Sequence, residues 1–456
     1  MINLKSFSER PKSHKIRFFA CYLGVLILLF AFCTSKTVPY SILEFSGTGN
    51  VSNYSKSFLL MLNKTDSVNP TPLIASSGDI IACDEKIFIY DEVFSQSRFF
   101  VKNNDSVLSI NGKLNSFDIP NNEKMIPWIK NLTKTDLSAL QFIRFNSKIQ
   151  ESYIPCLTEL AKIKIDAGLY FEGEFAEMAE LLRIFKPRYI ASPRLVRSDF
   201  DMLSKLSGLE ILMVSLEDSV KYDPLPSLPS LKQICLSNME KDITLSDNLL
   251  ANNKQIERVI VQKKGSIDFA VLKPLENLKE LVVSGVNAIV NFDEVNNHKK
   301  LEVFSVTGNE LVYDPALIKL PDLRWIAFSP NVTQEEFSSF IGAHSGLEII
   351  EIIGNNKINN LHPLSKLNML YGLTITDTVT DITSIKTLTN LKYLSMPDKF
   401  LSDKFMKEEI QKSLPDTHLT ANEGFCLGSG WLLLLIPFVL VIRLFGKRRK
   451  PNSQIG

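Results

Sequence analysis

A short hydrophobic phrase recurs nine times between residues 209 and 396, and this repetition constrains the fold more than any other feature of the chain. The phrase has apolar residues at its first, fourth and sixth places. Successive copies are separated by 22, 25, 22, 23, 22, 24, 23 and 21 residues. This period predicts a solenoid in which each coil supplies one short parallel strand and a return segment. The copies begin at Leu209, Leu231, Ile256, Leu278, Leu301, Leu323, Leu347, Leu370 and Leu391.

Weaker copies of the phrase and two dissimilar flanks set the expected limits of the array. The weaker copies begin at Leu140, Leu160 and Pro187, so we expect about twelve coils over residues 137–397. Residues 36–135 lack the repeat and alternate short β-rich stretches with Asn, Ser, Gly and Pro clusters, which predicts a mostly β cap with a helix near residues 123–132. Residues 398–419 are expected to form a helical C-terminal cap. Both caps are needed because the ends of an open solenoid expose apolar surface.

The best-formed repeat resembles the internalin-type leucine-rich repeat of bacteria. The segment GNNKINNLHPLSKLNMLYGLTIT, residues 354–376, matches the pattern LxxLxLxxNxIxxLxPLxxLxxL almost place for place. The resemblance implies an α/β leucine-rich-repeat solenoid with a parallel strand from each coil on its concave face. It also implies that Asn355 and Asn309 bond backbone groups at the turn after the strand, because an amide both donates and accepts. Other coils have Glu217, Met239 and Val286 at this position. The resemblance covers roughly residues 137–400 and specifies no ligand.

The two ends of the chain each combine an apolar segment with a basic tail. Residues 18–34 follow a basic tail, 1–17, and residues 427–445 precede another, 446–456. Basic residues stay on the cytoplasmic side, so we expect two terminal transmembrane segments in the cell membrane with the repeats outside the cytoplasm. The first segment has a length between those of a signal-peptide core and a spanning helix, so a cleaved signal peptide is the alternative to an anchor. A sorting signal clipped after export is the alternative for the second.

Charge and cysteine content exclude some classes of protein. The chain has 51 basic and 50 acidic residues, so it lacks the basic bias expected of a nucleic-acid binder. Its six cysteines are too few for a disulfide-built scaffold in a chain of 456 residues. In an oxidising compartment, a disulfide between Cys83 and Cys156 would join the N-terminal region to the first coils. Free buried thiols are the alternative.

Motifs that would indicate an enzyme, a metal site or a cofactor site are missing from the sequence. The five histidines are scattered without metal-ligand spacing, and we find no phosphate-binding loop and no Gly-x-Ser-x-Gly elbow. We therefore expect a protein that is not an enzyme and holds no metal or cofactor. Acidic pairs in residues 36–135 leave a hydrolase in that region as a less favoured alternative.

The second place of the phrase carries charges whose sign alternates from coil to coil. Equal places of successive coils stack about 4.8 Å apart, so opposite charges there attract and support in-register stacking. A row that neutralises itself is a poor binder of charged ligands. The row contains Glu210, Lys232, Glu257, Lys279, Glu302, Arg324 and Glu348.

The third and fifth places point away from the expected core, onto the concave face, and several are large and apolar. Exposed apolar groups often mark a contact site, and Trp and Tyr dominate interface energetics. We therefore predict that this face binds another protein or a surface polymer, with no nucleic-acid partner. The alternatives are that β-branched residues simply suit strands, that a loop covers them, or that the array is an envelope spacer without a ligand. The predicted contact residues are Ile260, Val282, Val303, Trp325, Ile349, Tyr371 and Tyr393.

Overall fold

The computed structural model describes residues 79–83, 86–90, 107–110 and 113–421, the last range with gaps at 141, 146–147, 192, 218–223, 239–243, 309–310, 329–330, 353–356, 371, 376–381, 392, 398–399, 401–402 and 416. All of these residues belong to one compact unit, Tyr40–Glu423. Both predicted membrane segments and both basic tails lie outside the described residues. Within the described ranges, no helix has the length and apolar character needed to cross a bilayer.

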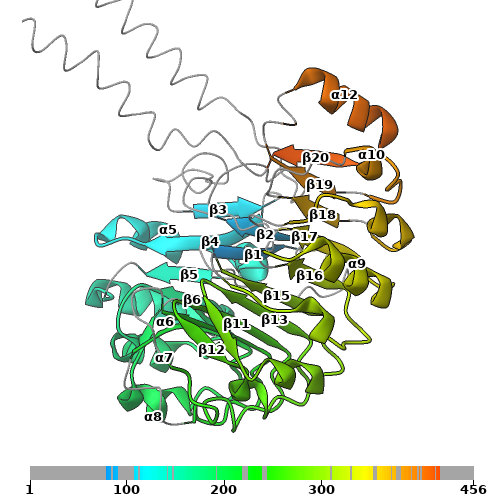
Figure 1. Ribbon diagram of the computed structural model, residues 1–456. Coiled ribbons are helices and arrows are strands. Elements are labelled where there is room, and N and C mark those ends of the chain that lie inside the picture. Colours follow the sequence, from blue (N-terminus) through cyan, green and yellow to red (C-terminus); the bar gives the residue numbers. More distant parts are fainter. Residues whose placement is uncertain are drawn as a thin grey trace, which may run out of the picture. The chain divides into compact units, whose positions relative to one another are not determined.

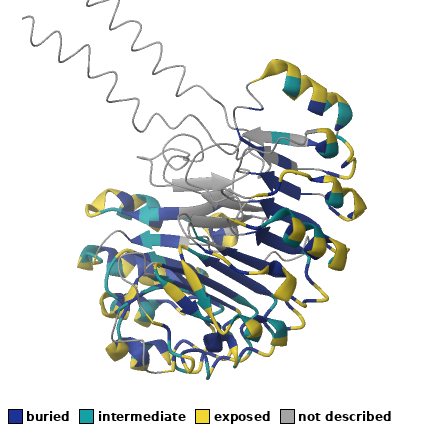
Figure 2. Cartoon of the chain, in the orientation of Figure 1, coloured by how far each residue is buried: buried dark blue, intermediate teal, exposed yellow. Residues whose placement is uncertain are grey.

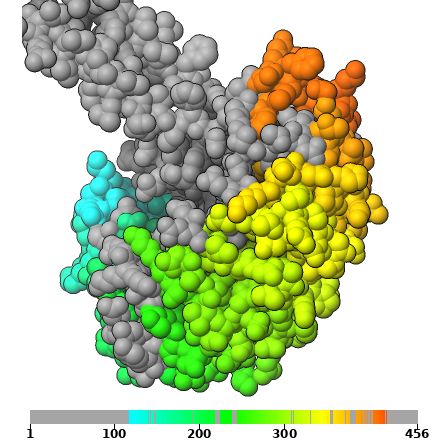
Figure 3. Space-filling model, in the orientation of Figure 1, coloured from blue at the N-terminus to red at the C-terminus, as the bar shows by residue number. Residues whose placement is uncertain are grey.

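Parallel strands from successive coils form one sheet in which spatial order follows chain order (Figure 1). The strands lie on the inner side of the curve and the return segments on its outer side. Figure 3 shows the coils following one another as a contiguous surface in chain order. The parallel strands are β4 (Lys113–Ile119), β5 (Phe142–Phe145), β6 (Gly168–Phe171), β7 (Tyr189–Ala191), β9 (Ile211–Leu216), β10 (Gln233–Asn238), β11 (Arg258–Lys263), β13 (Glu280–Ser284), β15 (Val303–Thr307), β16 (Trp325–Phe328), β17 (Ile349–Ile352), β18 (Gly372–Ile375), β19 (Tyr393–Met396) and β20 (His418–Ala421).

The strand register places equal positions of the phrase side by side. Ile260 of β11 pairs with Val282 of β13, and Trp325 of β16 pairs with Ile349 of β17. Every pairing from β4 to β20 is parallel, and the coils repeat at the interval read from the sequence. The fold is therefore an α/β leucine-rich-repeat solenoid, which confirms the predicted repeat class.

The array begins one coil earlier than the expected boundary at residue 137. Strand β4 pairs in parallel with β5, and its segment Leu114–Ile119 carries the phrase with Leu114, Phe117 and Ile119 buried. Strand β3 (Val107–Ile110) runs antiparallel to β4. The segment after β4 contains a 3-10 turn, η2 (Glu123–Met125), and a helix, α5 (Ile126–Lys130), close to the expected helix. Further upstream, β1 (Asp79–Cys83) and β2 (Lys86–Tyr90) form an antiparallel hairpin.

The phrase expected at Leu160 is not a strand. It overlaps the end of helix α6 (Ile154–Ile163), whose buried face contains Cys156, Leu157, Leu160 and Ala161. Apolar residues three and four places apart also fit one face of a helix, so this short pattern was ambiguous. The strand of that coil is β6, which follows the helix.

The C-terminal helix belongs to a further coil. Helix α12 (Lys404–Ser413) lies within the expected cap, residues 398–419, and buries Ile410. It leads into β20, which pairs in parallel with β19, so the helix is a return segment as well as a cover.

Return segments of the other coils are mostly short helices, and two of them pair as strands β12 (Ser266–Asp268) and β14 (Ala288–Val290). Together with the inward places of the phrase they enclose one continuous hydrophobic core (Figure 2). The helical segments are η3 (Asp136–Ala139), η4 (Glu151–Tyr153), η5 (Phe175–Met178), α7 (Ala179–Ile184), η6 (Arg197–Asp199), α8 (Phe200–Leu203), η8 (Phe269–Leu272), η9 (Phe292–Asn297), η10 (Pro315–Leu317), α9 (Gln334–Ala343), η11 (His362–Lys366) and α10 (Ile382–Ile385).

Buried polar side chains tie neighbouring coils together just before the strands. The amide of Asn253 accepts a hydrogen bond from the Leu228 N–H (2.9 Å) and donates to the Pro226 carbonyl (3.0 Å). His298, at the same place two coils later, contacts the Leu275 carbonyl through Nδ1 (3.0 Å). These groups satisfy backbone atoms that the strand ladder leaves unpaired. The two asparagines expected to do this after the strand, Asn309 and Asn355, lie outside the described residues.

Substitution of Gly308 by Ala should destabilise the solenoid, because a Cβ there would lie 1.7 Å from the Val286 carbonyl oxygen of the preceding coil. Backbone cannot yield as a flexible side chain does, so we expect a loss of at least about 1–3 kcal/mol in the free energy of unfolding, measured by chemical denaturation. Gly342→Ala in helix α9 is the control. It meets no atom within 4 Å and should gain up to about 1 kcal/mol from helix propensity. Equal stabilities for the two variants would contradict the close approach of the coils.

Candidate functional site: the concave strand face

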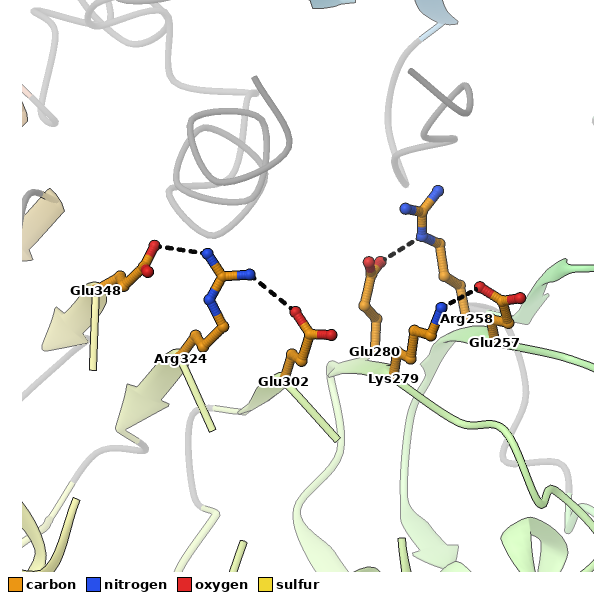
Figure 4. Close-up of polar contacts among 7 residues, drawn as sticks. All are labelled: Glu257, Arg258, Lys279, Glu280, Glu302, Arg324 and Glu348. Carbon is orange, nitrogen blue, oxygen red and sulfur yellow. Dashed lines mark hydrogen bonds and ion pairs between the residues drawn. The ribbon is translucent and has the colours of Figure 1, made fainter. Parts of the chain in front are cut away.

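A row of alternating charges runs across the coils at the second place of the phrase, and we call it the charge ladder. Glu257 and Lys279 form an ion pair of 2.9 Å, and Arg324 bridges Glu302 (3.0 Å) and Glu348 (2.9 Å) (Figure 4). The predicted attraction between neighbours is confirmed at these three contacts. The ladder consists of Arg188, Glu210, Lys232, Glu257, Lys279, Glu302, Arg324 and Glu348.

Backbone hydrogen bonds hold the ladder residues in place, in addition to the ion pairs between their side chains. At each step the N–H of one ladder residue donates to the carbonyl of the previous one, for example Lys279 to Glu257 (2.8 Å) and Glu302 to Lys279 (2.7 Å). Arg188 was missed from sequence because its coil carries a weak phrase. It forms an ion pair with Glu210 at 2.7 Å and so extends the ladder by one coil.

Lys232 interrupts the chain of ion pairs. Its neighbours Glu210 and Glu257 form ion pairs with Arg188 and Lys279, on their far sides. Among the described residues the exposed Lys232 side chain has no ion-pair partner, so its ammonium group is accessible to another molecule.

The predicted contact residues lie in rows across neighbouring strands, but their side chains are not exposed. Ile260 and Val282 are each 3% exposed, and Val303, Trp325 and Ile349 are 0% exposed. The expectation of an apolar patch facing water is therefore wrong. Alternation along a strand decides on which face a side chain lies, but it does not decide whether that face meets solvent. Of the two tyrosines, Tyr371 lies outside the described residues, and Tyr393 lies in β19 with its side chain outside them.

Polar groups are interspersed among these buried apolar side chains. Gln233, Ser305, Glu351 and Thr374 are fully buried in the same two rows, and Glu280 is 6% exposed. The concave face is thus chemically mixed, in contrast to the core on the other side of the sheet, which is almost wholly apolar. Such polar groups define direction and specificity where a purely apolar surface would not.

Arg258 and Glu280 form the most deeply buried ion pair on this face. The Arg258 Nε atom lies 2.7 Å from Glu280 Oε2, and the two side chains are 12% and 8% exposed. Burial raises the pKa of Glu280 to about 7, although the guanidinium of Arg258 opposes that shift. Burial also raises the pKa of the nearby Cys235 thiol to about 12, so that thiol is not a nucleophile at neutral pH.

The first coils place a second polar group on the concave face. Arg144 lies 3.2 Å from Asp118 and stacks over the Tyr170 ring at 5.1 Å, and the Tyr170 hydroxyl donates to Glu172. Burial raises the pKa of Asp118 against the opposing effect of Arg144. Sequence analysis missed this group because the coil of Asp118 was assigned to the cap.

The predicted disulfide between Cys83 and Cys156 is not formed. Cys156 is a buried free thiol on α6 that donates to the Tyr153 carbonyl, and Cys235 is also a buried free thiol. The alternative of a free buried thiol is confirmed for Cys156. Among the described residues, no cluster of three His, Cys, Asp or Glu side chains is arranged to hold a metal ion.

Comparison with known proteins gives structural likenesses only. No family model matches the sequence, and no curated protein matches it. An internalin C2 of Listeria monocytogenes is 20% identical with a TM-score of 0.25, over 35% of this chain and 70% of its own. A leucine-rich-repeat protein of Leptospira interrogans is 16% identical with a TM-score of 0.31, over 66% of this chain and 99% of its own. A second Listeria monocytogenes internalin is 15% identical with a TM-score of 0.32, over 66% of this chain and 88% of its own.

Substitution of Trp325 by Ala should destabilise the protein, because the indole is fully buried. Large-to-small changes at such sites cost about 3–5 kcal/mol, which denaturant unfolding followed by circular dichroism would detect. Val312→Ala is the control, since that side chain is 70% exposed and its loss should change the free energy by less than about 0.5 kcal/mol. Unchanged stability of the Trp325 variant would show that the indole is not packed.

Proposed function

We propose that this chain is a membrane-anchored, extracytoplasmic leucine-rich-repeat protein that binds another protein through its concave face. The observation that supports this most is the preformed, in-register sheet from β4 to β20, whose second places carry a row of partly exposed charges. A face that is already ordered loses little conformational entropy on association. Repeat arrays of this kind present extended concave surfaces for binding.

The accessible part of that face is the charge ladder. The side chains of Lys279, Glu257, Glu302 and Arg324 are between 24% and 43% exposed, whereas the third and fifth places from β13 to β18 are buried. Most ladder charges are already paired with their neighbours, so they contribute little to the binding of a charged partner. Lys232 is the ladder residue whose charge is not paired among the described residues. Its ammonium group can therefore bind a carboxylate of the partner.

A photo-reactive lysine analogue that keeps the ammonium group, placed at Lys232, should form a covalent adduct with a partner protein in intact cells. The same amino acid at Lys366, exposed on the outer side in η11, should not. Gel mobility and mass spectrometry would identify the adduct. Adducts from Lys366 alone would place the binding face elsewhere, and the absence of protein adducts from both positions would favour a surface polymer or a spacer.

The membrane arrangement is tested by cysteine labelling. Lys366→Cys should react with a membrane-impermeant maleimide in intact cells, because we expect the repeats outside the cytoplasm. Lys450→Cys, in the basic tail 446–456, should react only after the membrane is opened. The unchanged chain, which has six native cysteines, gives the background to be subtracted. Of these, Cys156 and Cys235 are buried. The reverse pattern would overturn the proposed orientation.

A further inference from the structure

Glu280 occupies an unusual position in the sheet for a carboxylate. It lies at the third place of β13, between Arg258 of β11 and Val303 of β15, and Val282 follows it on the same face. Only 6% of the residue is exposed. Transfer of an ionised carboxylate from water to such a site is costly unless several partners compensate it.

The contact with Arg258 compensates Glu280 only in part. It joins one nitrogen, Nε, to one oxygen, Oε2, and is not the two-point fork that makes Arg–carboxylate pairs strong.

Among the described residues, each of the other two charges that act on Glu280 is already paired with another ladder residue. Lys279 is bound to Glu257, and Glu302, which repels Glu280, is bound to Arg324. Burial, and to a smaller extent the repulsion from Glu302, favour the protonated form of Glu280 and outweigh the attractions of Arg258 and Lys279.

We propose that Glu280 is a proton-responsive group of the concave face, which loses its negative charge in a mildly acidic environment and so changes the affinity of that face for its partner. The change in affinity rests on the proposed binding function, whereas the protonation does not. Uptake of the proton makes the face more positive by one unit of charge. An acidic partner would then bind more tightly at lower pH.

The same group makes stability depend on pH. Its pKa is about 7 in the folded chain and 4.5 for an ordinary glutamate, so between these values the folded state holds one proton more than the unfolded state. Stability from this group is therefore greater at the acidic end and decreases as pH rises towards 7. One proton corresponds to a change of up to about tenfold per pH unit in the unfolding equilibrium constant.

The test compares the purified full-length protein with Glu280→Gln between about pH 5 and 8. In the unchanged protein, infrared spectra should contain a protonated carboxyl band at pH 6 that fades by pH 8 and is missing from the variant. Denaturant unfolding should show the steep pH dependence in the unchanged protein and not in E280Q. Glu210→Gln, three coils away in the charge ladder, should keep both signals.

A carboxyl band that is the same in E280Q, or equal pH slopes, would overturn the inference even if Lys232 forms adducts. If the band behaves as expected, the adduct yield at Lys232 should differ at least severalfold between pH 6 and 8 in the unchanged protein and not in E280Q. Equal yields at the two pH values would remove the link to binding. Absence of adducts with a normal band would refute the proposed function and leave the protonation in place.

Discussion

The interior row of apolar side chains is the constraint on which the rest of this structure depends. Because the first, fourth and sixth places of every coil must enter one dry core, each strand has to stack on the previous one without a shift in register. A slip by one residue would exchange the buried and outward faces of a strand. Parallel register in turn places equal outward positions side by side, and so the ladder of charges and the rows of the concave face follow from the core.

The electrostatic contacts on this sheet have two different roles. Exposed pairs such as Glu257–Lys279 contribute only about 0–1 kcal/mol each, so they favour the correct register more than they stabilise the fold. The Arg258–Glu280 pair is buried, and its energy is a balance between desolvation and attraction. A small change in its surroundings therefore alters the protonation state of Glu280.

The repeat and its in-register stacking could be predicted from the sequence because they are periodic. The nine strong phrases all became strands, and the alternation of sign at the second place gave ion pairs at four of the seven steps of the charge ladder. The first coil was missed because LNSFDI is a single weak copy beside β-rich segments, and the phrase at Leu160 was misread because its spacing also fits a helix. Burial of the outward rows could not be predicted, since it depends on tertiary neighbours that strand periodicity does not encode.

The burial of Trp325 changes the role expected of its indole ring. An exposed indole at the centre of a concave face would be the natural anchor for a partner, but a fully buried one mainly stabilises the chain that contains it. Loss of binding in a Trp325 variant would therefore not separate a contact from a folding defect. Lys232 is free of that ambiguity, because its side chain is exposed while its backbone remains fixed by the N–H···O bonds of the ladder. Recognition by this protein is best tested where a side chain is accessible and its loss leaves the core intact.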